Sequence, residues 1–450
     1  MKRKFGVSVK LCLILLAGVL AAGGAYAQKT EREQRDEQKT KQAQAVSKEV
    51  YDKILQAQEK VDVEDYNGAL RILQNLNRSD KLTEYERSNV LNYIGFVHYN
   101  VGNTTAAIAT YEEMLRIPSL EEQIRKQTIY TVAQLYTMDE NYNKAIRYIE
   151  EWFTLELNPA PDPYILYAQN LYQVNRYRDM IKPIETAMEI ARKREKPVKE
   201  DWYVLLNFAY FQQEDYRKVR DIQKIMLVNW PKKRYWFSLA GAYTELGEEN
   251  NLFASYDAAH TQKMLERESE LVTMAQLYMQ HEVPYKAATL LDYEMENGRV
   301  SRNAKNYRLL SQAWSLAQED EKSIPALKEA ARLSNEGELD LRLGNAYLNL
   351  GRYAECVSAV QAGLRKGGIK SSDNAQISLG MCLYNQQKYR AAINSFREAR
   401  KTRRSARIAN QWINVINSDI KRNEQIALAE AAARKQLREL AKRREASGRI

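Results

Sequence analysis

The amino-acid sequence predicts an all-α protein, a right-handed α-solenoid of about ten helix-turn-helix repeats. Apolar residues recur every three to four positions through most of the chain, which indicates amphipathic helices. A small residue also recurs every 33 to 39 residues, and only 18 glycines and 9 prolines interrupt the 450 residues. Long helices joined by short turns fit this composition better than a sheet protein with many hairpins.

The stretch 339–364, LDLRLGNAYLNLGRYAECVSAVQAGL, is the clearest copy of the repeat. Leu343, Gly344 and Tyr347 lie on one face of a predicted first helix, and after Gly351 the apolar period resumes in a second helix. Gly344 is small where the two helices must cross, and Gly351 supplies the turn between them. Because one such pair cannot bury its apolar face, neighbouring repeats must stack on it.

The small residue of the first helix locates the ten repeats along the chain. It falls at Ala57, Gly95, Ala133, Ala168, Asn207, Ala240, Ala275, Ser311, Gly344 and Gly380. Aromatic and alanine residues follow it at regular offsets, and the pattern is similar to that of the tetratricopeptide (TPR) repeat. The array is predicted to span residues 48–400.

The segments that flank the array differ from it in composition. Residues 1–27 resemble a secretory signal peptide, with a basic start, an apolar run from Leu11 to about Ala22, and Ala25-Tyr26-Ala27 before Gln28. A membrane span needs roughly 20 apolar residues, more than this run provides, so we expect cleavage and a periplasmic protein; a retained anchor is the alternative. The remaining segments are predicted to be a charged linker at 28–47, a capping helix at 401–423 and a basic helical tail at 424–450.

The positive charge of the chain is concentrated at its two ends. Of the net charge of +10, residues 1–27 contribute +4, and Arg397–Ile450 contributes +9 through fifteen Lys/Arg against six Asp/Glu. The body between them carries −3. A nearly neutral body without a basic stripe argues against nucleic acid as a partner and leaves the tail as the electrostatic patch.

The sequence contains no motif that would carry catalysis. It has no phosphate-binding loop, dinucleotide fingerprint, His-Glu-x-x-His or Cys-x-x-Cys, and its three histidines are scattered. We therefore expect a non-enzymatic protein without a metal or another cofactor. Cys356 and Cys382 lie in adjacent repeats, where export would permit a disulfide, but both occupy small packing positions, which favours buried free thiols.

A partner-binding groove is the remaining candidate for function. In TPR arrays the first helices line a concave face through the positions three before and one and four after the small residue. Applied to repeats two to five, this rule predicts an aromatic and amide surface, without the cations that clamp a terminal carboxylate in other TPR grooves. Its residues are Asn92, Phe96, Tyr99, Tyr130, Gln134, Gln169, Tyr172, Phe208 and Phe211, with Ile165 and Val204. An extended peptide fits this surface; the alternative is that the rings pack against neighbouring helices.

Several stretches resemble a narrower family. They are 158–169 (NPAPDPYILYAQ), 231–247 (PKKRYWFSLAGAYTELG), 269–288 (SELVTMAQLYMQHEVPYKAA), 312–344, 366–380 (KGGIKSSDNAQISLG) and 408–412. In these stretches the chain resembles the exported TPR proteins that accompany TonB, ExbB and ExbD in proteobacterial outer-membrane energy transduction. The resemblance implies a periplasmic scaffold that binds periplasmic segments of such a complex and supports iron–siderophore transport. Peripheral membrane association would then occur through the complex or the basic tail.

Two other classes of function stay open beside this one. A periplasmic chaperone or outer-membrane assembly adaptor would use the same groove on extended segments of unfolded clients. An envelope enzyme built on a helical solenoid is disfavoured by the missing acid–base cluster. Binding of one defined partner, as opposed to many extended peptides, would distinguish a dedicated scaffold from a chaperone.

Overall fold

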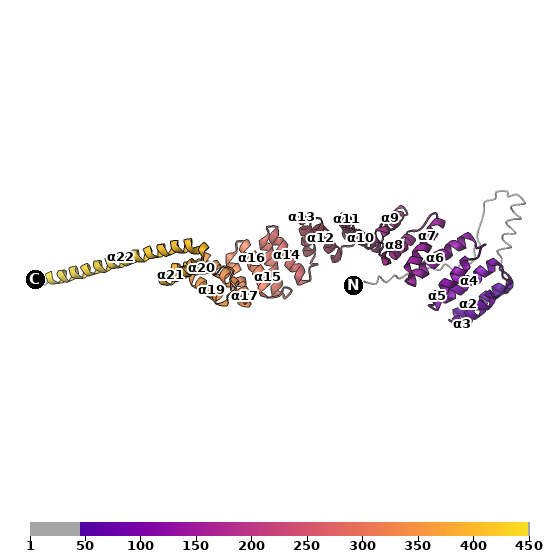
Figure 1. The fold of residues 1–450 in the computed structure, drawn as a ribbon, viewed down its shortest axis with the longest axis horizontal. Helices are drawn as coiled ribbons and strands as arrows, with labels where there is room; N and C mark the ends of the chain where they lie inside the picture. Colours follow the sequence, from indigo (N-terminus) through magenta and orange to yellow (C-terminus); the bar gives the residue numbers. More distant parts are fainter. Residues whose placement is uncertain (1–45, 449–450) are drawn as a thin grey trace. The chain divides into compact units, whose positions relative to one another are not determined.

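The computed structural model describes residues 46–448, with the side chains of 445–447 excepted. The predicted signal peptide at 1–27 and nearly all of the predicted linker at 28–47 lie outside the described residues. Within 46–448 all regular secondary structure is α-helical and comprises the helices α2 to α22 (Figure 1). The predicted all-α solenoid of helical hairpins is confirmed, and its hairpins are the ten predicted repeats.

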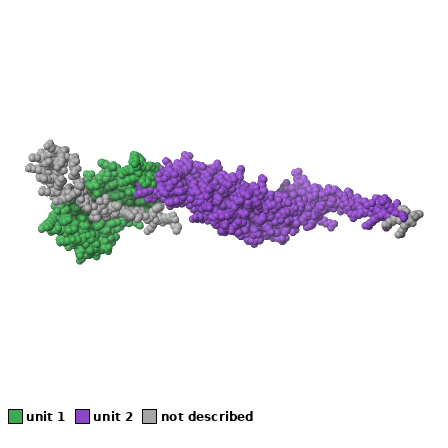
Figure 2. All heavy atoms as spheres, turned by 180° about the vertical axis from the view of Figure 1, so that it is seen from behind, with its two compact units in different colours: residues 1–198 green, residues 199–450 purple. Residues whose placement is uncertain are grey.

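The chain forms two compact units, and the boundary between them in the sequence lies between Val198 and Lys199 (Figure 2). The first unit holds repeats one to four. Their helices are α2 (Lys48–Asp62) and α3 (Tyr66–Asn77), α4 (Glu84–Asn100) and α5 (Thr104–Leu115), α6 (Glu122–Met138) and α7 (Tyr142–Leu155), and α8 (Pro161–Gln173) and α9 (Tyr177–Lys193).

The second unit holds repeats five to ten and the last helix. Its helices are α10 (Glu200–Gln212) and α11 (Tyr216–Asn229), α12 (Lys233–Glu245) and α13 (Glu249–Thr261), α14 (Glu268–Gln280) and α15 (Pro284–Glu296), α16 (Ala304–Leu316) and α17 (Asp320–Leu333), α18 (Glu338–Asn349) and α19 (Tyr353–Lys366), α20 (Ser372–Asn385) and α21 (Tyr389–Arg400), and α22 (Arg403–Ser447).

The turn inside each repeat has the same length and conformation. Each places one residue at positive φ, seven residues after the small residue of the first helix. These residues are Glu64, Gly102, Glu140, Asn175, Glu214, Gly247, Glu282, Gln318, Gly351 and Gln387, with φ between 56° and 79°. Glycine, which adopts this conformation without steric cost, occupies only three of the ten positions.

The two helices of a repeat cross at the small residue, which lies opposite a residue sixteen positions later. A Cβ added to Gly95 would lie 2.7 Å from the ring of Tyr111, and one added to Gly380 would lie 2.7 Å from the ring of Phe396. Real Cβ atoms do not approach ring carbons this closely. In repeats two and ten a glycine therefore stands where the opposite side chain is an aromatic ring, which packs directly against the backbone of the first helix.

Acidic side chains near the start of first helices bind to neighbouring repeats. Glu84 accepts a hydrogen bond from the Ser119 amide (3.1 Å), and Glu268 accepts one from the Ser301 amide (3.2 Å). Asp373 of α20 is buried and pairs with Arg404, whose Nε donates to Oδ2 at 2.7 Å. These contacts supplement the apolar packing between consecutive repeats.

The last helix, α22, continues without interruption past the predicted boundary between capping helix and tail at 423/424. Its first part covers the array, because Ala409 and Ile416 are fully buried and Trp412 stacks on Phe396 of α21 with centroids 5.6 Å apart. All side chains from Lys421 to Arg444 are exposed. None of the helices in the described part of the chain is long and apolar enough to span a membrane.

Cys356 of α19 and Cys382 of α20 form a disulfide, with Cα atoms 6.2 Å apart. The expectation of free thiols is therefore wrong. Both residues do occupy small packing positions and are fully buried, but they belong to one hydrophobic cluster rather than to two separate repeat interiors. The contact between the second helix of repeat nine and the first helix of repeat ten brings the two sulfur atoms together.

Candidate partner-binding surface

The structure places the predicted groove residues on first helices, distributed over both compact units. Seven of the nine lie in the first unit: Asn92, Phe96 and Tyr99 on α4, Tyr130 and Gln134 on α6, and Gln169 and Tyr172 on α8. The other two, Phe208 and Phe211, lie on α10 in the second unit. Each set is a surface of its own unit.

The aromatic rings of the first unit also contribute to packing. Tyr130 contacts Trp152 of α7 with ring centroids 4.9 Å apart, and burial raises the pKa of the Tyr130 hydroxyl. Phe96 and Tyr99 pack against the hydrophobic clusters of their own and neighbouring repeats. All three side chains remain half-buried, so one part of each ring packs against helices and the rest stays accessible to a ligand.

The amide side chains and Phe211 are more available for binding. Asn92 is exposed, and Gln134 and Gln169 are half-buried. Phe211 has 51% of its surface exposed, although its ring meets that of Tyr216 edge to face at 6.0 Å. A large apolar side chain exposed on a first helix is a candidate anchor for a partner.

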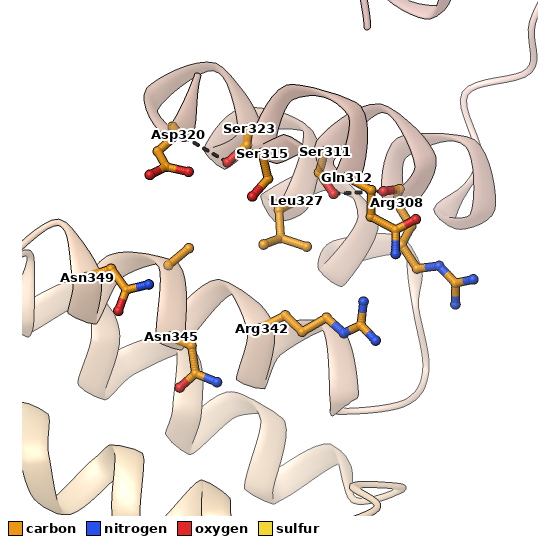
Figure 3. A pocket seen from close by; sticks show the side chains of 11 residues that line it. Arg308, Ser311, Gln312, Ser315, Asp320, Ser323, Leu327, Arg342, Asn345 and Asn349 are labelled. Carbon is orange, nitrogen blue, oxygen red and sulfur yellow. Dashed lines mark hydrogen bonds between the residues drawn. The ribbon is translucent and has the colours of Figure 1, made fainter. Parts of the chain in front are cut away.

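A pocket of about 270 Å³ lies in the second unit between α16, α17 and α18 (Figure 3). Its polar lining includes Arg308 and Gln312 of α16, Asp320 of α17, and Arg342, Asn345 and Asn349 of α18. Figure 3 shows the guanidinium groups of Arg308 and Arg342 extending to the same end of the pocket, whereas Asp320 lies at the other end. Three serines, Leu327 and Ala346 complete the lining.

The sequence-based prediction missed this pocket because it applied the positional rule only to repeats two to five. Arg308 stands three residues before the small residue Ser311, and Gln312 stands one after it, so the same rule identifies both. Asn345 likewise follows the small residue Gly344. Arg342 lies two residues before Gly344 and falls outside the rule, so only the structure shows that it belongs to the pocket.

The histidines take part in packing and hydrogen bonding. His281 stacks on Phe253 with ring centroids 4.3 Å apart, and His260 Nδ1 lies 3.3 Å from the Tyr278 hydroxyl. Burial lowers the pKa of His98, which disfavours its charged form. Among the described residues, no group of three or more His, Cys, Asp or Glu side chains could hold a metal ion.

A scan against protein-family models and a search of curated proteins each find no match. Many solved structures are similar to parts of the chain, and three of them illustrate the extent of the similarity. MamA protein is 18% identical, with a TM-score of 0.32, over 38% of this chain and 90% of that chain. A tetratricopeptide repeat protein from Parabacteroides merdae is 14% identical, with a TM-score of 0.35, over 64% of this chain and 94% of that chain.

The third structure is YrrB, a TPR protein with an unusual peptide-binding site. It is 16% identical to this chain, with a TM-score of 0.34, over 42% of this chain and 95% of that chain. At these identities and TM-scores the similarity concerns the fold alone.

Proposed function

We propose that the protein is a non-enzymatic scaffold that binds extended segments of protein partners on the first helices of its repeats. The observation that carries this proposal is the recurrence of accessible aromatic and amide side chains at equivalent positions of successive first helices. None of the nine groove residues is charged, and Phe211 is exposed although it is a large apolar residue. Amides can bind the backbone of an extended peptide, and aromatic rings can bind its side chains.

We propose further that the partner is a periplasmic segment of a TonB-type complex that supports outer-membrane iron–siderophore transport. The support for this step is the sequence resemblance of stretches such as 158–169 and 231–247 to exported TPR proteins of that system. Periplasmic parts of such partners tend to be extended and Pro-rich, and aromatic grooves bind preformed extended chains at low entropic cost.

A periplasmic location is part of this proposal. It depends on cleavage between Ala27 and Gln28, which the small residues Ala25 and Ala27 favour. The intact mass of protein recovered from the periplasm tests this directly, because a mass that retains the apolar run would contradict it.

The groove is tested by copurification of the full chain with the periplasmic domains of candidate TonB, ExbB and ExbD partners. The triple variant Tyr99→Ala, Tyr172→Ala, Phe211→Ala should lose most of the binding, since truncation of an anchor commonly costs roughly 2 kcal/mol or more. Tyr293→Ala is the matched control, because Tyr293 is 59% exposed but lies on the second helix α15. Circular dichroism must first show that each variant folds.

Two results would count against this function. Undiminished copurification of the folded triple variant would exclude the groove as the binding site. Comparable affinity for many unrelated unfolded proteins would instead favour the alternative, a periplasmic chaperone or outer-membrane assembly adaptor.

A further inference from the structure

We propose that α22 binds an acidic, amphipathic helix of a partner protein along one exposed apolar stripe, where the second helix of an eleventh repeat would pack. The stripe consists of Ile408, Val415, Ile426, Ala433, Leu437 and Leu440. This surface is separate from the first-helix groove and goes beyond the scaffold function proposed for it, because its ligand is a helix instead of an extended segment.

The spacing and exposure of the stripe residues are the first evidence. Successive members are 7, 11, 7, 4 and 3 positions apart, and these intervals all return to the same side of an α-helix. The five large aliphatic side chains each expose between 44% and 66% of their surface, and Ala433 is exposed as well. A continuous aliphatic line on a helix surface is typical of a seam with another helix.

The first part of α22 takes the position of the first helix of a repeat. It packs against α21, the second helix of repeat ten. Trp412 follows the buried Ala409 by three positions. In repeat nine, Tyr347 follows the small residue Gly344 by the same interval. α22 then continues without a turn, so no second helix packs on it within the described part of the chain (Figure 1).

The missing second helix leaves one side of α22 open. In repeats nine and ten the residue directly before the small residue is buried, with 6% of Leu343 and 7% of Leu379 exposed. The equivalent residue of α22, Ile408, is 44% exposed, and Val415, one heptad later, is 46% exposed. Because a first helix cannot bury its apolar surface without a neighbour, this is the side on which a partner helix packs.

The charged residues on the line of the stripe are paired within α22. In the middle of the stripe, Asp419 and Arg422 form an ion pair at 2.8 Å. Further along, Glu430 and Arg434 lie 3.7 Å apart. A partner helix can therefore cover the line without leaving an isolated charge beneath it.

The net charge of α22 selects an acidic partner. Residues 403–444 contain eleven Lys/Arg against four Asp/Glu, a net charge of +7. Arg407 flanks the stripe on one side, because it directly precedes Ile408, and Arg434 flanks the other side, one residue after Ala433. A second copy of α22 would bring an equal positive charge against the first, which disfavours self-association. An acidic helix instead complements these flanks, as oppositely charged flanking residues do in coiled coils.

The width of the stripe favours a helix over a lipid surface as the ligand. The stripe spans roughly 60° of the helix circumference at 3.6 residues per turn. Helices that lie in a bilayer surface present a broader apolar face, commonly with aromatic side chains. Residues 421–444 contain no aromatic residue, and Leu428 is isolated on the opposite side of the helix.

Two labelled helical peptides of five heptads, about the length of the stripe, test the proposal. Both carry Leu at position d and Ala at position a of each heptad. The acidic peptide has Glu at positions e and g, where the basic peptide has Lys. Fluorescence anisotropy with the full chain at about 0.15 M salt should show binding of the acidic peptide and at least tenfold weaker binding of the basic one.

Substitutions on the exposed end of the stripe should weaken this binding without unfolding the chain. Ile426→Gln with Leu437→Gln and Leu440→Gln, the stripe variant, should bind the acidic peptide at least tenfold more weakly, since it lacks the apolar contacts. Leu428→Gln is the matched control and should bind normally, because Leu428 is 71% exposed on the opposite side of the same helix. Circular dichroism must first show that each variant folds.

Ile408→Gln with Val415→Gln tests where the bound helix lies. These two residues mark the place of the missing second helix, so this variant should also bind the acidic peptide several-fold more weakly. Unchanged binding by this folded variant would overturn the proposal. Equal affinity for the acidic and basic peptides, or an equal loss in the Leu428 control, would overturn it as well.

Two further measurements examine the other possible occupants of the stripe. Sedimentation of the full chain alone should show no dimer that the stripe variant dissociates. Vesicles of equal parts phosphatidylcholine and phosphatidylglycerol should show no binding that the stripe variant loses. Either result would contradict the proposal, because a second copy or a lipid surface would then cover the stripe.

Failure of this inference is distinguishable from failure of the scaffold function. The triple groove variant of Tyr99, Tyr172 and Phe211 should bind the acidic peptide normally, since none of these residues lies on α22. A chain that copurifies with its partner through the groove but does not bind the acidic peptide would retain the scaffold function and lose this inference.

Discussion

Gly344 of α18 faces Val360 of α19 so closely that a Cβ on Gly344 would overlap Val360 Cγ2. Both residues are buried in the hydrophobic cluster that runs from α17 to α22. The helix crossing of repeat nine thus depends on the absence of a side chain at one position.

We therefore expect Gly344→Leu to destabilise repeat nine, since overpacking costs roughly 1–3 kcal/mol. In a repeat array the effect should begin locally, so hydrogen exchange should accelerate first in α18, α19 and their neighbours. Gly241→Leu is the control, because a Cβ there meets no atom within 4 Å. A uniform loss of protection over both compact units would contradict the prediction.

The turns offer a substitution that should stabilise the protein, in contrast to Gly344→Leu. Gln387 adopts φ = 61°, where a residue with a Cβ is strained and glycine is not. Gln387→Gly should therefore stabilise the protein by up to about 1 kcal/mol, measured as a higher urea midpoint. The neighbouring Gln386, at φ = −84°, is the control, and glycine there should not stabilise. A lower midpoint for Gln387→Gly would refute this account of the turns.

These turns also show how much of the fold was visible in the sequence. The spacing of small residues located all ten repeats, and Gly351 correctly indicated a turn. Positions such as Glu140 and Gln318 gave no such signal, because a polar residue at positive φ looks like any exposed residue in a sequence. Their turns follow only from the constant offset of seven residues from the small position.

Only some residues of the candidate sites could be predicted from the sequence. A positional rule could identify the groove residues and Arg308, because helix periodicity alone determines which side of a first helix they occupy. It could not identify Arg342 as part of the pocket that Arg308 lines, since that arrangement depends on how two repeats pack. The disulfide between Cys356 and Cys382 was unpredictable for the same reason.

Acid should destabilise the protein through its paired carboxylates. Burial alone would raise the pKa of Glu86, but hydrogen bonds from Ser47 and Thr83 outweigh it and lower the pKa to about 2. Hydrogen bonds from Lys232, Tyr235 and Arg234 likewise lower the pKa of Glu200 to about 2. Because the unfolded chain takes up these protons more readily, the stabilisation is present above pH 4.5 and is lost as the pH falls towards 2.

Urea midpoints measured between pH 7 and pH 2.5 check this prediction. Glu86→Gln should lower the midpoint at pH 7 and reduce its fall on acidification, whereas Glu113→Gln, an exposed site on α5, should do neither. The carboxylate account of acid sensitivity fails if Glu86→Gln leaves the pH profile of the midpoint unchanged.

The disulfide should stabilise repeats nine and ten. The disulfide closes a loop with a sequence separation of 26 residues, for which the chain-entropy argument gives about 3.5 kcal/mol. Cys356→Ala with Cys382→Ala should lower the urea midpoint and accelerate hydrogen exchange in α18 to α21. Alkylation of unreduced, denatured protein, followed by mass measurement, should leave both cysteines unmodified. Two alkylated cysteines at these positions would show that the thiols are free.

The exposed end of α22 should contribute to association and not to folding. Residues 424–450 carry seven Lys/Arg against four Glu, and their described side chains are all exposed. Deleting 424–450 should leave the urea midpoint unchanged, because none of the side chains described in this segment is buried. It should lower the association rate with an acidic partner at about 0.01 M salt, where the Debye length is about 30 Å, and have little effect at about 1 M.

Deletion of 403–450 is the comparison that separates these two roles. It removes the buried residues Ala409 and Ile416 together with the stacking of Trp412 on Phe396, so it should destabilise repeat ten at every salt concentration. If the shorter deletion also destabilises the array, the exposed helix packs against the protein in solution. If deletion of 424–450 abolishes partner binding at high salt as well as at low salt, the tail is itself a binding site. The first-helix groove is then not sufficient for binding.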